Sequence, residues 1–220
     1  MDRKFTFEEG EYYHIYNRGV DKRKIFFSKG DWNHFQRLLF VRNSAGGHIR
    51  LPRSNNVPLA AIKREGALVD ICAYAMMSNH FHLLVRDKGD DSTSKFMGKF
   101  LTAFSLYMNK KYERSGPMMC RPFRAKHIDS DEYFRFLISY IHLNPMDQMQ
   151  SDWKEKGIRD KKQALEFLRG YEYSSYYDYF VRERDESLVL SKESLPVGID
   201  DLEDLSAMLD ASRNEIVKSE

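Results

Sequence analysis

Two apolar runs with only three residues between them constrain the fold of this chain more than any other feature. Val69–Met76 and His80–Arg86 are both rich in the aliphatic and aromatic residues that favour strands. Met77-Ser78-Asn79 between them is short enough for a tight connection, so the two runs predict a hairpin. We therefore expect the chain to fold around an antiparallel sheet.

Further strands and helices are expected on both sides of this hairpin. Tyr12–Asn17 is β-branched and aromatic and predicts a strand, and the basic stretch Arg121–Lys126 is expected to be extended. Apolar residues at helical spacing predict three helices, which begin near Ser28, near residue 92 and near Ser130. The order β-α-β-β-α-β-α predicts an α+β fold of the ferredoxin-like type, a central antiparallel sheet packed by helices.

The remaining segments have weaker patterns. Residues 43–66 predict a long irregular connection, and residues 160–168 a short helix. Residues 171–180 contain five tyrosines, which can pack across the domain or stack on bases. We expect a main domain over residues 1–150, a tyrosine-rich segment over 151–180 that packs on it or extends it, and a helical or irregular acidic extension over 181–220, with a short helix at 199–210.

Composition excludes several classes of protein. At 42% hydrophobic and 14% aromatic residues, the chain is too rich in core-forming side chains to be disordered. No apolar run approaches the roughly 18 residues needed to cross a bilayer, so we expect no membrane partner. The first residues carry no apolar signal segment, and Cys72 and Cys120 do not make a disulfide framework. We therefore expect a cytoplasmic protein.

The net charge of +2 hides an asymmetry along the chain. Residues 181–220 hold 11 acidic and 5 basic side chains, a net charge of −6, so residues 1–180 carry +8. A basic body with aromatic residues throughout fits a nucleic-acid partner, although an ordinary solvated surface has the same composition. The acidic tail can act as a solvating extension or as a cover for the basic surface.

His80-Phe81-His82 is the first candidate functional motif. Residues i and i+2 of a strand share a face, so the two imidazoles lie side by side while Phe81 points into the core. Paired imidazoles are common metal ligands. The alternative is one surface histidine and one hydrogen-bonded core histidine without a metal.

Tyr140 and Asn144 form the second candidate motif. They are four residues apart and are therefore neighbours on one face of the third predicted helix. They lie at the edge of the apolar stripe that runs from Phe134 to Ile141, where side chains reach a cleft rather than the middle of the core. Taken alone, the pair is also compatible with a tyrosine at the rim of a core and an asparagine that ends a helix.

Together these four side chains suggest phosphoryl transfer. Two neutral imidazoles and an amide oxygen bind a divalent cation without cancelling its charge, and a DNA phosphate supplies the missing anionic ligands. A metal held in this way acts as a Lewis acid on the phosphate. A tyrosine hydroxyl can then attack the phosphorus and form a phosphotyrosine, which keeps the bond energy for a later rejoining step.

Three segments occur in an order that a known family shares. They are Tyr13-His14-Ile15-Tyr16-Asn17-Arg18-Gly19, Met77-Ser78-Asn79-His80-Phe81-His82-Leu83-Leu84-Val85 and Tyr140-Ile141-His142-Leu143-Asn144-Pro145. With the later Tyr173-Ser174-Ser175-Tyr176, the chain resembles the single-tyrosine HUH transposases, and most closely the REP-associated tyrosine transposase branch. The resemblance covers roughly residues 10–180. Ser78 departs from the pattern, because relatives commonly have proline there.

The resemblance implies a transposase that nicks and rejoins single-stranded or hairpin DNA. It implies that His80 and His82 bind Mg²⁺ or Mn²⁺ and that Tyr140 is the nucleophile that joins the 5′ side of the cut. Asn144 stands where the family places a polar ligand, often glutamine, and direct ligation by the shorter asparagine stays open. Relatives include monomers and dimers, so a homodimer is compatible with the resemblance.

Other residues are secondary candidates. Six basic residues are candidate contacts to DNA phosphates, which give affinity but little sequence information: Arg18, Lys95, Lys99, Arg121, Arg124 and Lys126. His14 and His142 are candidates near the site, but His142 is two positions after Tyr140 and is expected to point about 200° around the helix, away from the cleft. Cys72 is expected to be a small core residue.

Two other function classes stay open. A domesticated relative could bind hairpin or repeat DNA without catalysis, with its motifs retained for folding. A structural zinc protein could use His80 and His82, but Cys72 and Cys120 form no paired motif that would complete the usual four zinc ligands.

Overall fold

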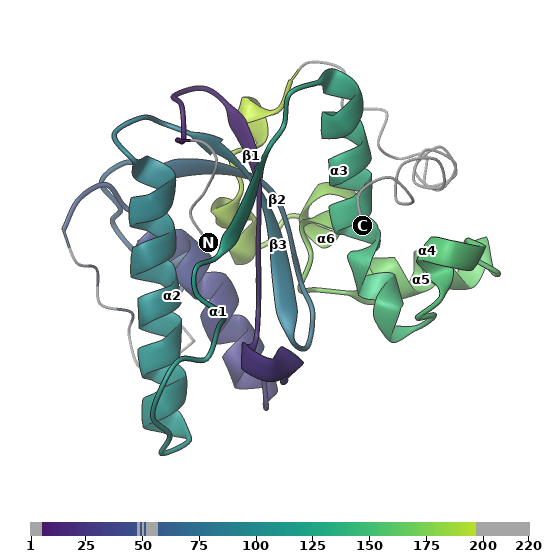
Figure 1. Cartoon of the computed structure of the whole chain (residues 1–220), viewed down its shortest axis with the longest axis horizontal. Helices are drawn as coiled ribbons and strands as arrows, with labels where there is room; N and C mark the ends of the chain where they lie inside the picture. Colours follow the sequence, from purple (N-terminus) through teal and green to yellow (C-terminus); the bar gives the residue numbers. More distant parts are fainter. Residues whose placement is uncertain (1–5, 48, 50, 52–56, 197–220) are drawn as a thin grey trace.

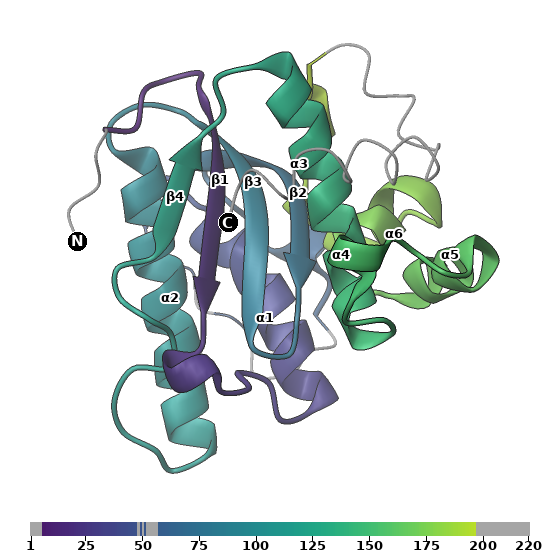
Figure 2. The same cartoon turned by 45° about the vertical axis from the view of Figure 1, so that its right-hand side comes forward.

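The computed structural model describes residues 6–47, 49, 51 and 57–196. At its centre lies a four-stranded sheet with the strand order β2-β3-β1-β4 (Figure 2). All paired strands are antiparallel, and the predicted hairpin is confirmed, with β2 and β3 paired from Val69 opposite Asp87 to Met76 opposite Phe81. The strands are β1 (Tyr12–Arg18), β2 (Val69–Met76), β3 (His80–Asp87) and β4 (Arg124–His127).

Three long helices cover the two faces of the sheet. α1 (Lys29–Arg42) and α2 (Ser92–Lys111) lie on one face, and α3 (Asp131–Leu143) lies on the other (Figure 1). The element order and the strand order confirm the predicted ferredoxin-like fold. α2 ends before residue 114, where its end was expected, and Glu113 takes a left-handed backbone conformation with φ of 50° just after it.

Alternation along the strands divides the side chains between two cores. Ile15 and Phe81 belong to the apolar core under α1 and α2. Leu84 packs instead with Leu137 and Ile141 under α3. Each fully buried aliphatic or aromatic side chain stabilises the fold by about 1.5–3 kcal/mol. The face toward α3 is therefore the one on which β3 also presents its histidines.

The chain continues in helical turns after α3. α3 ends at Leu143, as Pro145 predicts, and the 3-10 helix η3 (Asn144–Gln148) follows directly, because a proline in the first turn of a helix loses no hydrogen bond. The short helix expected over 160–168 corresponds to α5. The later helices are α4 (Trp153–Lys156), α5 (Lys161–Gly170) and α6 (Ser175–Phe180).

The tyrosine-rich segment is fastened to β2. The hydroxyl of Tyr171 donates to the carbonyl of Met76 (2.6 Å), and that of Tyr179 donates to the carbonyl of Cys72 (2.8 Å). Tyr176 is buried among the residues of α3 and α5. Of the two roles considered for these tyrosines, the structure shows packing across the domain.

Residues 181–196 fold back onto the domain through η4 (Asp185–Val189) and η5 (Lys192–Ser194). Val189 is buried in the core under α1 and α2, and the backbone N–H of Ser191 donates to the carbonyl of Ile71 (2.9 Å). The helix expected at 199–210 lies outside the described residues, as does part of the 43–66 connection. In the described part of the chain, no helix is both long and apolar enough to cross a membrane.

Candidate active site

β3 presents two imidazoles on the face toward α3. The ring centroids of His80 and His82 lie 5.2 Å apart, with the ring planes at 85°. Phe81 between them points to the other face, where its ring lies 5.2 Å from Phe35 and 5.8 Å from Phe100. The predicted alternation is therefore confirmed, and the two histidines share one site.

Each of these imidazoles is held at Nδ1 by a neighbour. His14 of β1 lies beside His82, and its Nε2 is 2.8 Å from the Nδ1 of His82. The Nδ1 of His80 is 2.7 Å from the Oδ1 of Asn79. The site thus contains three imidazoles from two adjacent strands, and the orientation of the β3 pair is fixed by hydrogen bonds.

Burial keeps these rings uncharged. It lowers the pKa of His14 to about 3, and the charge of Lys126 acts in the same direction. Burial, with neighbouring His14 and His80, lowers the pKa of His82 well below 6.5. Burial also lowers the pKa of His80, although the Asn144 carboxamide opposes the shift. At neutral pH all three imidazoles are neutral, which is the form that binds metal ions.

α3 brings Tyr140 to the imidazoles. The Tyr140 ring lies edge to face with His82, at a centroid distance of 5.5 Å, and 6.3 Å from His14. On its other side, the ring packs against Phe136 (5.9 Å), and the Nζ of Lys154 lies 5.2 Å from its centroid. The structure thus places the candidate nucleophile beside the candidate metal ligands.

Asn144 is fully buried at the end of α3. Its Nδ2 donates to the carbonyl of Tyr140 (3.1 Å), as expected for neighbours four residues apart. Its Oδ1 has no hydrogen bond of good geometry, although the carboxamide is close enough to His80 to favour the charged form of that ring and so act on its pKa. A buried carbonyl oxygen without a donor costs about 1–3 kcal/mol. A bound divalent cation would satisfy it.

These donors supply only part of the ligands that a divalent cation needs. Imidazole nitrogens suit Zn²⁺, Cu²⁺, Fe²⁺ or Ni²⁺, whereas the amide oxygen suits Mg²⁺ or Mn²⁺, so these last two cations fit only if the substrate adds anionic oxygens. Among the described residues, no three His, Cys, Asp or Glu side chains lie together in a way that could hold a metal ion. In the part of the chain that the structure describes, Asn144 is therefore the further protein donor beside His80 and His82, and a substrate would add the rest.

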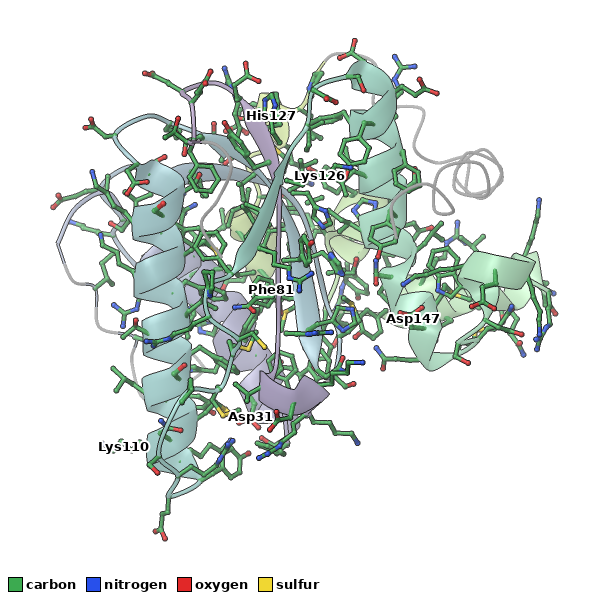
Figure 3. The ribbon with its side chains drawn as sticks, viewed as in Figure 1. Asp31, Phe81, Lys110, Lys126, His127 and Asp147 are labelled. Atoms are coloured by element: carbon green, nitrogen blue, oxygen red, sulfur yellow. The ribbon has the colours of Figure 1, made fainter. Side chains whose placement is uncertain are left out.

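A cleft of about 1210 Å³ opens beside His80. Among the described residues that line it, five are basic and only Asp147 is acidic. Figure 3 shows Lys126, from β4, and Asp147, after α3, on the α3 side of the sheet. The basic lining residues are Arg18, Lys22, Arg121, Arg124 and Lys126. Four of the six candidate DNA contacts are therefore gathered in one cleft.

Lys95 and Lys99 do not join this cleft. Both lie on α2, which covers the opposite face of the sheet from Tyr140. The Nζ of Lys99 donates to the carbonyl of Ser44 (3.1 Å). The sequence pattern showed that these lysines are on the exposed side of a helix, but not which face of the sheet that helix covers.

Two charged residues beside the site were not among the candidates. Asp147 accepts hydrogen bonds from the indole N–H of Trp153 (2.6 Å) and from the Nζ of Lys154 (3.2 Å). Asp147 follows Asn144 by three residues, which is helical spacing. Because the predicted helix ends before Pro145, the prediction did not place Asp147 on the same helical face as Asn144.

His142 and Cys72 lie away from the site, as expected. His142 is fully buried, with its Nε2 2.8 Å from the hydroxyl of Ser175. Cys72 is buried in the core under α3, and this burial raises the pKa of its thiol. Both cysteines are free.

Comparison with known proteins bears on the fold. No family model matches the chain, and no curated protein sequence matches it. Among solved structures, the chain is similar to one described as "Structure of the REP associates tyrosine transposase bound to a REP hairpin". The TM-score is 0.54 at 11% sequence identity, over 83% of this chain and 86% of that chain. The four-stranded antiparallel sheet with its covering helices is thus the fold of a tyrosine transposase structure.

Proposed function

We propose that this protein is a DNA transposase that nicks and rejoins single-stranded DNA at structured ends through a 5′-phosphotyrosine intermediate. The observation that carries the proposal is the position of Tyr140 against the histidine pair, His80 and His82, beside a basic cleft. The transposase structure that shares the fold is described as bound to a REP hairpin, which supports a hairpin substrate for this chain.

The charge of the cleft supports a DNA substrate. Within the described part of the chain, its five cations form no ion pair with a carboxylate. Unpaired cations are available to phosphates, and their neutralisation of DNA charge gives affinity that falls as salt rises. The cleft includes His80, so a bound strand would pass next to the histidine pair.

The proposed cleavage step is a transesterification. The Tyr140 oxygen forms a bond to the scissile phosphorus while the bond from phosphorus to the 3′ oxygen breaks. The phenolic proton ends on the released 3′ oxygen, and the 5′ phosphate stays on the tyrosine. Rejoining reverses the step with another 3′ hydroxyl. A divalent cation held by His80, His82 and Asn144 would supply Lewis-acid polarisation of the phosphate.

Tyr140→Phe tests this function. Wild-type protein is incubated with Mn²⁺ and hairpin DNA, and the products are separated on a denaturing gel. The DNA is labelled upstream of the cut in one reaction and downstream of the cut in another. The tyrosine is joined to the 5′ phosphate of the downstream fragment, so wild type is expected to give a covalent band that carries the label of that fragment, whereas Tyr140→Phe binds the DNA and gives none. Tyr177→Phe, on α6 and outside the lining of the cleft, is the control and should keep the band. An undiminished adduct in Tyr140→Phe would refute the assignment.

A DNA-binding protein without catalysis is the alternative. One observation favours it: no three His, Cys, Asp or Glu side chains among the described residues are placed to hold a metal without help from Asn144. In that case wild type binds the hairpin, with salt-sensitive affinity, and forms no covalent band in Mg²⁺ or Mn²⁺.

A further inference from the structure

His14 is the residue at the site to which no role has been given. It lies on β1, is 7% exposed, and contacts His82 through nitrogen atoms 2.8 Å apart. The rings are nearly parallel, at 20°, with centroids 5.0 Å apart. His82 is 6% exposed, so little water competes for this hydrogen bond. The contact therefore fixes the orientation of the His82 ring.

The neighbouring His80 shows that such a contact decides which ring nitrogen carries the proton. The Asn79 side chain donates its Nδ2 to the carbonyl of Lys22 (3.2 Å), which turns its Oδ1 toward the Nδ1 of His80. An amide oxygen can only accept, so His80 carries its proton on Nδ1. The lone pair of His80 is then on Nε2. Hydrogen bonding at the second nitrogen is the usual way in which proteins fix a metal-binding imidazole.

We propose that His14 is a positioning residue that does the same for His82. In this arrangement the Nδ1–H of His82 donates to the Nε2 of His14, and His14 carries its own proton on Nδ1. The Nε2 of His82 is left with a lone pair for the divalent cation. This inference rests on the proposed metal-dependent function, and it adds the residue that selects the ligating form of His82.

The opposite direction of the hydrogen bond gives a different site. If His14 donated, His82 would carry its proton on Nε2 and could not bind a cation through that atom. Tyr16 stacks on His14, with ring centroids 4.9 Å apart at 30°, and Tyr140 stands edge to face with it. These rings limit reorientation of His14, so the direction of one hydrogen bond decides whether His82 is ready for a metal.

Histidine-labelled wild-type protein gives the first test. Nitrogen-15 NMR of the metal-free protein distinguishes the two neutral tautomers of each imidazole. The expected spectrum has His82 and His14 both protonated at Nδ1. His82 protonated at Nε2 would overturn the proposal, whatever the protein does with DNA.

Metal affinity gives the second test. Binding of Mn²⁺ alone, followed by the electron paramagnetic resonance of free Mn²⁺, is expected to weaken about 10- to 100-fold in His14→Leu, the range typical when a partner of a metal ligand is removed. His14→Gln should restore most of the affinity, because the Oε1 of glutamine can accept near the position of the imidazole Nε2.

His142→Leu controls for the loss of a buried histidine and should bind Mn²⁺ like wild type. Wild-type affinity in a folded His14→Leu would overturn the proposal, and so would equal loss in His14→Leu and His14→Gln, which indicates a direct ligand. Wild type that binds no Mn²⁺ would instead contradict the proposed metal-dependent function, while the NMR result still decides the direction of the hydrogen bond.

Discussion

Asp31, in the first turn of α1, is a buried carboxylate that joins the start of α1 to the end of α2. It accepts from the backbone N–H groups of Phe27 and Ser28 (both 2.9 Å), from Tyr112 (2.7 Å) and from Lys111 (2.6 Å). Burial by itself would raise the pKa of Asp31, but these hydrogen bonds outweigh it and lower the pKa to about 2. The carboxylate therefore contributes stability that is fully present above pH 3.8, its ordinary pKa, and is lost as the pH falls through about 2.

Asp31→Asn is expected to lower the free energy of unfolding at neutral pH by about 2 kcal/mol, because the amide loses charge-assisted hydrogen bonds and turns an acceptor into a donor. The difference from wild type should shrink between about pH 4 and pH 2, as Asp31 becomes protonated in the folded protein. Urea unfolding across this range measures both effects. Asp129→Asn, an exposed carboxylate before α3, is the control and should change stability by less than about 0.5 kcal/mol. Equal stability of Asp31→Asn and wild type at neutral pH would contradict the argument.

At the scale of elements, the two faces of the sheet carry cations with different expected roles. Arg121 and Arg124 line the cleft on the α3 side, and Lys95 and Lys99 lie on α2 across the sheet. Arg121→Gln/Arg124→Gln should weaken hairpin binding and reduce the slope of log affinity against log salt by about 1.4 if both contact single-stranded phosphates. Lys95→Gln/Lys99→Gln removes the same charge from equally exposed positions. Fluorescence anisotropy over a salt series measures the slopes. Equal effects of the two double variants would contradict the assignment of the cleft as the DNA-binding site.

The elements that the sequence predicts well are those with a strong local pattern. In the β2–β3 hairpin and in α3, apolar residues recur with the periodicity of a strand and of a helix, respectively. The same periods placed His80 with His82 and Tyr140 with Asn144. β4 has four residues without apolar alternation, and it forms because β1 pairs with it. The position of Tyr140 against His82 and the contact of His14 with His82 depend on how strands and helices pack, which no local period contains.

At the scale of the whole molecule, the acidic C-terminal region has two parts. Residues 197–220 hold 7 acidic and 2 basic side chains, a net charge of −5, so the rest of the chain carries +7. Residues 181–196 contribute to the domain instead. Arg184 donates to Asp178 (2.7 Å), Asp185 accepts from the backbone N–H of Leu59 (2.5 Å), and Val189 is buried. Removing everything after residue 180 would thus change both charge and packing.

Two truncations separate these effects. A chain that ends at residue 196 loses net negative charge and keeps the contacts of Arg184 and Val189, so it should keep its melting temperature and bind hairpin DNA more tightly, with a steeper salt dependence. A chain that ends at residue 180 loses those contacts as well, and its melting temperature should fall by at least about 5 °C, because burial of Val189 alone is worth about 1.5–3 kcal/mol. Calorimetry and anisotropy on both chains measure the two quantities. Unchanged DNA affinity in the 196-residue chain would show that the acidic residues do not cover the basic cleft. An unchanged melting temperature in the 180-residue chain would show that the packing of residues 181–196 adds nothing to the stability of the sheet.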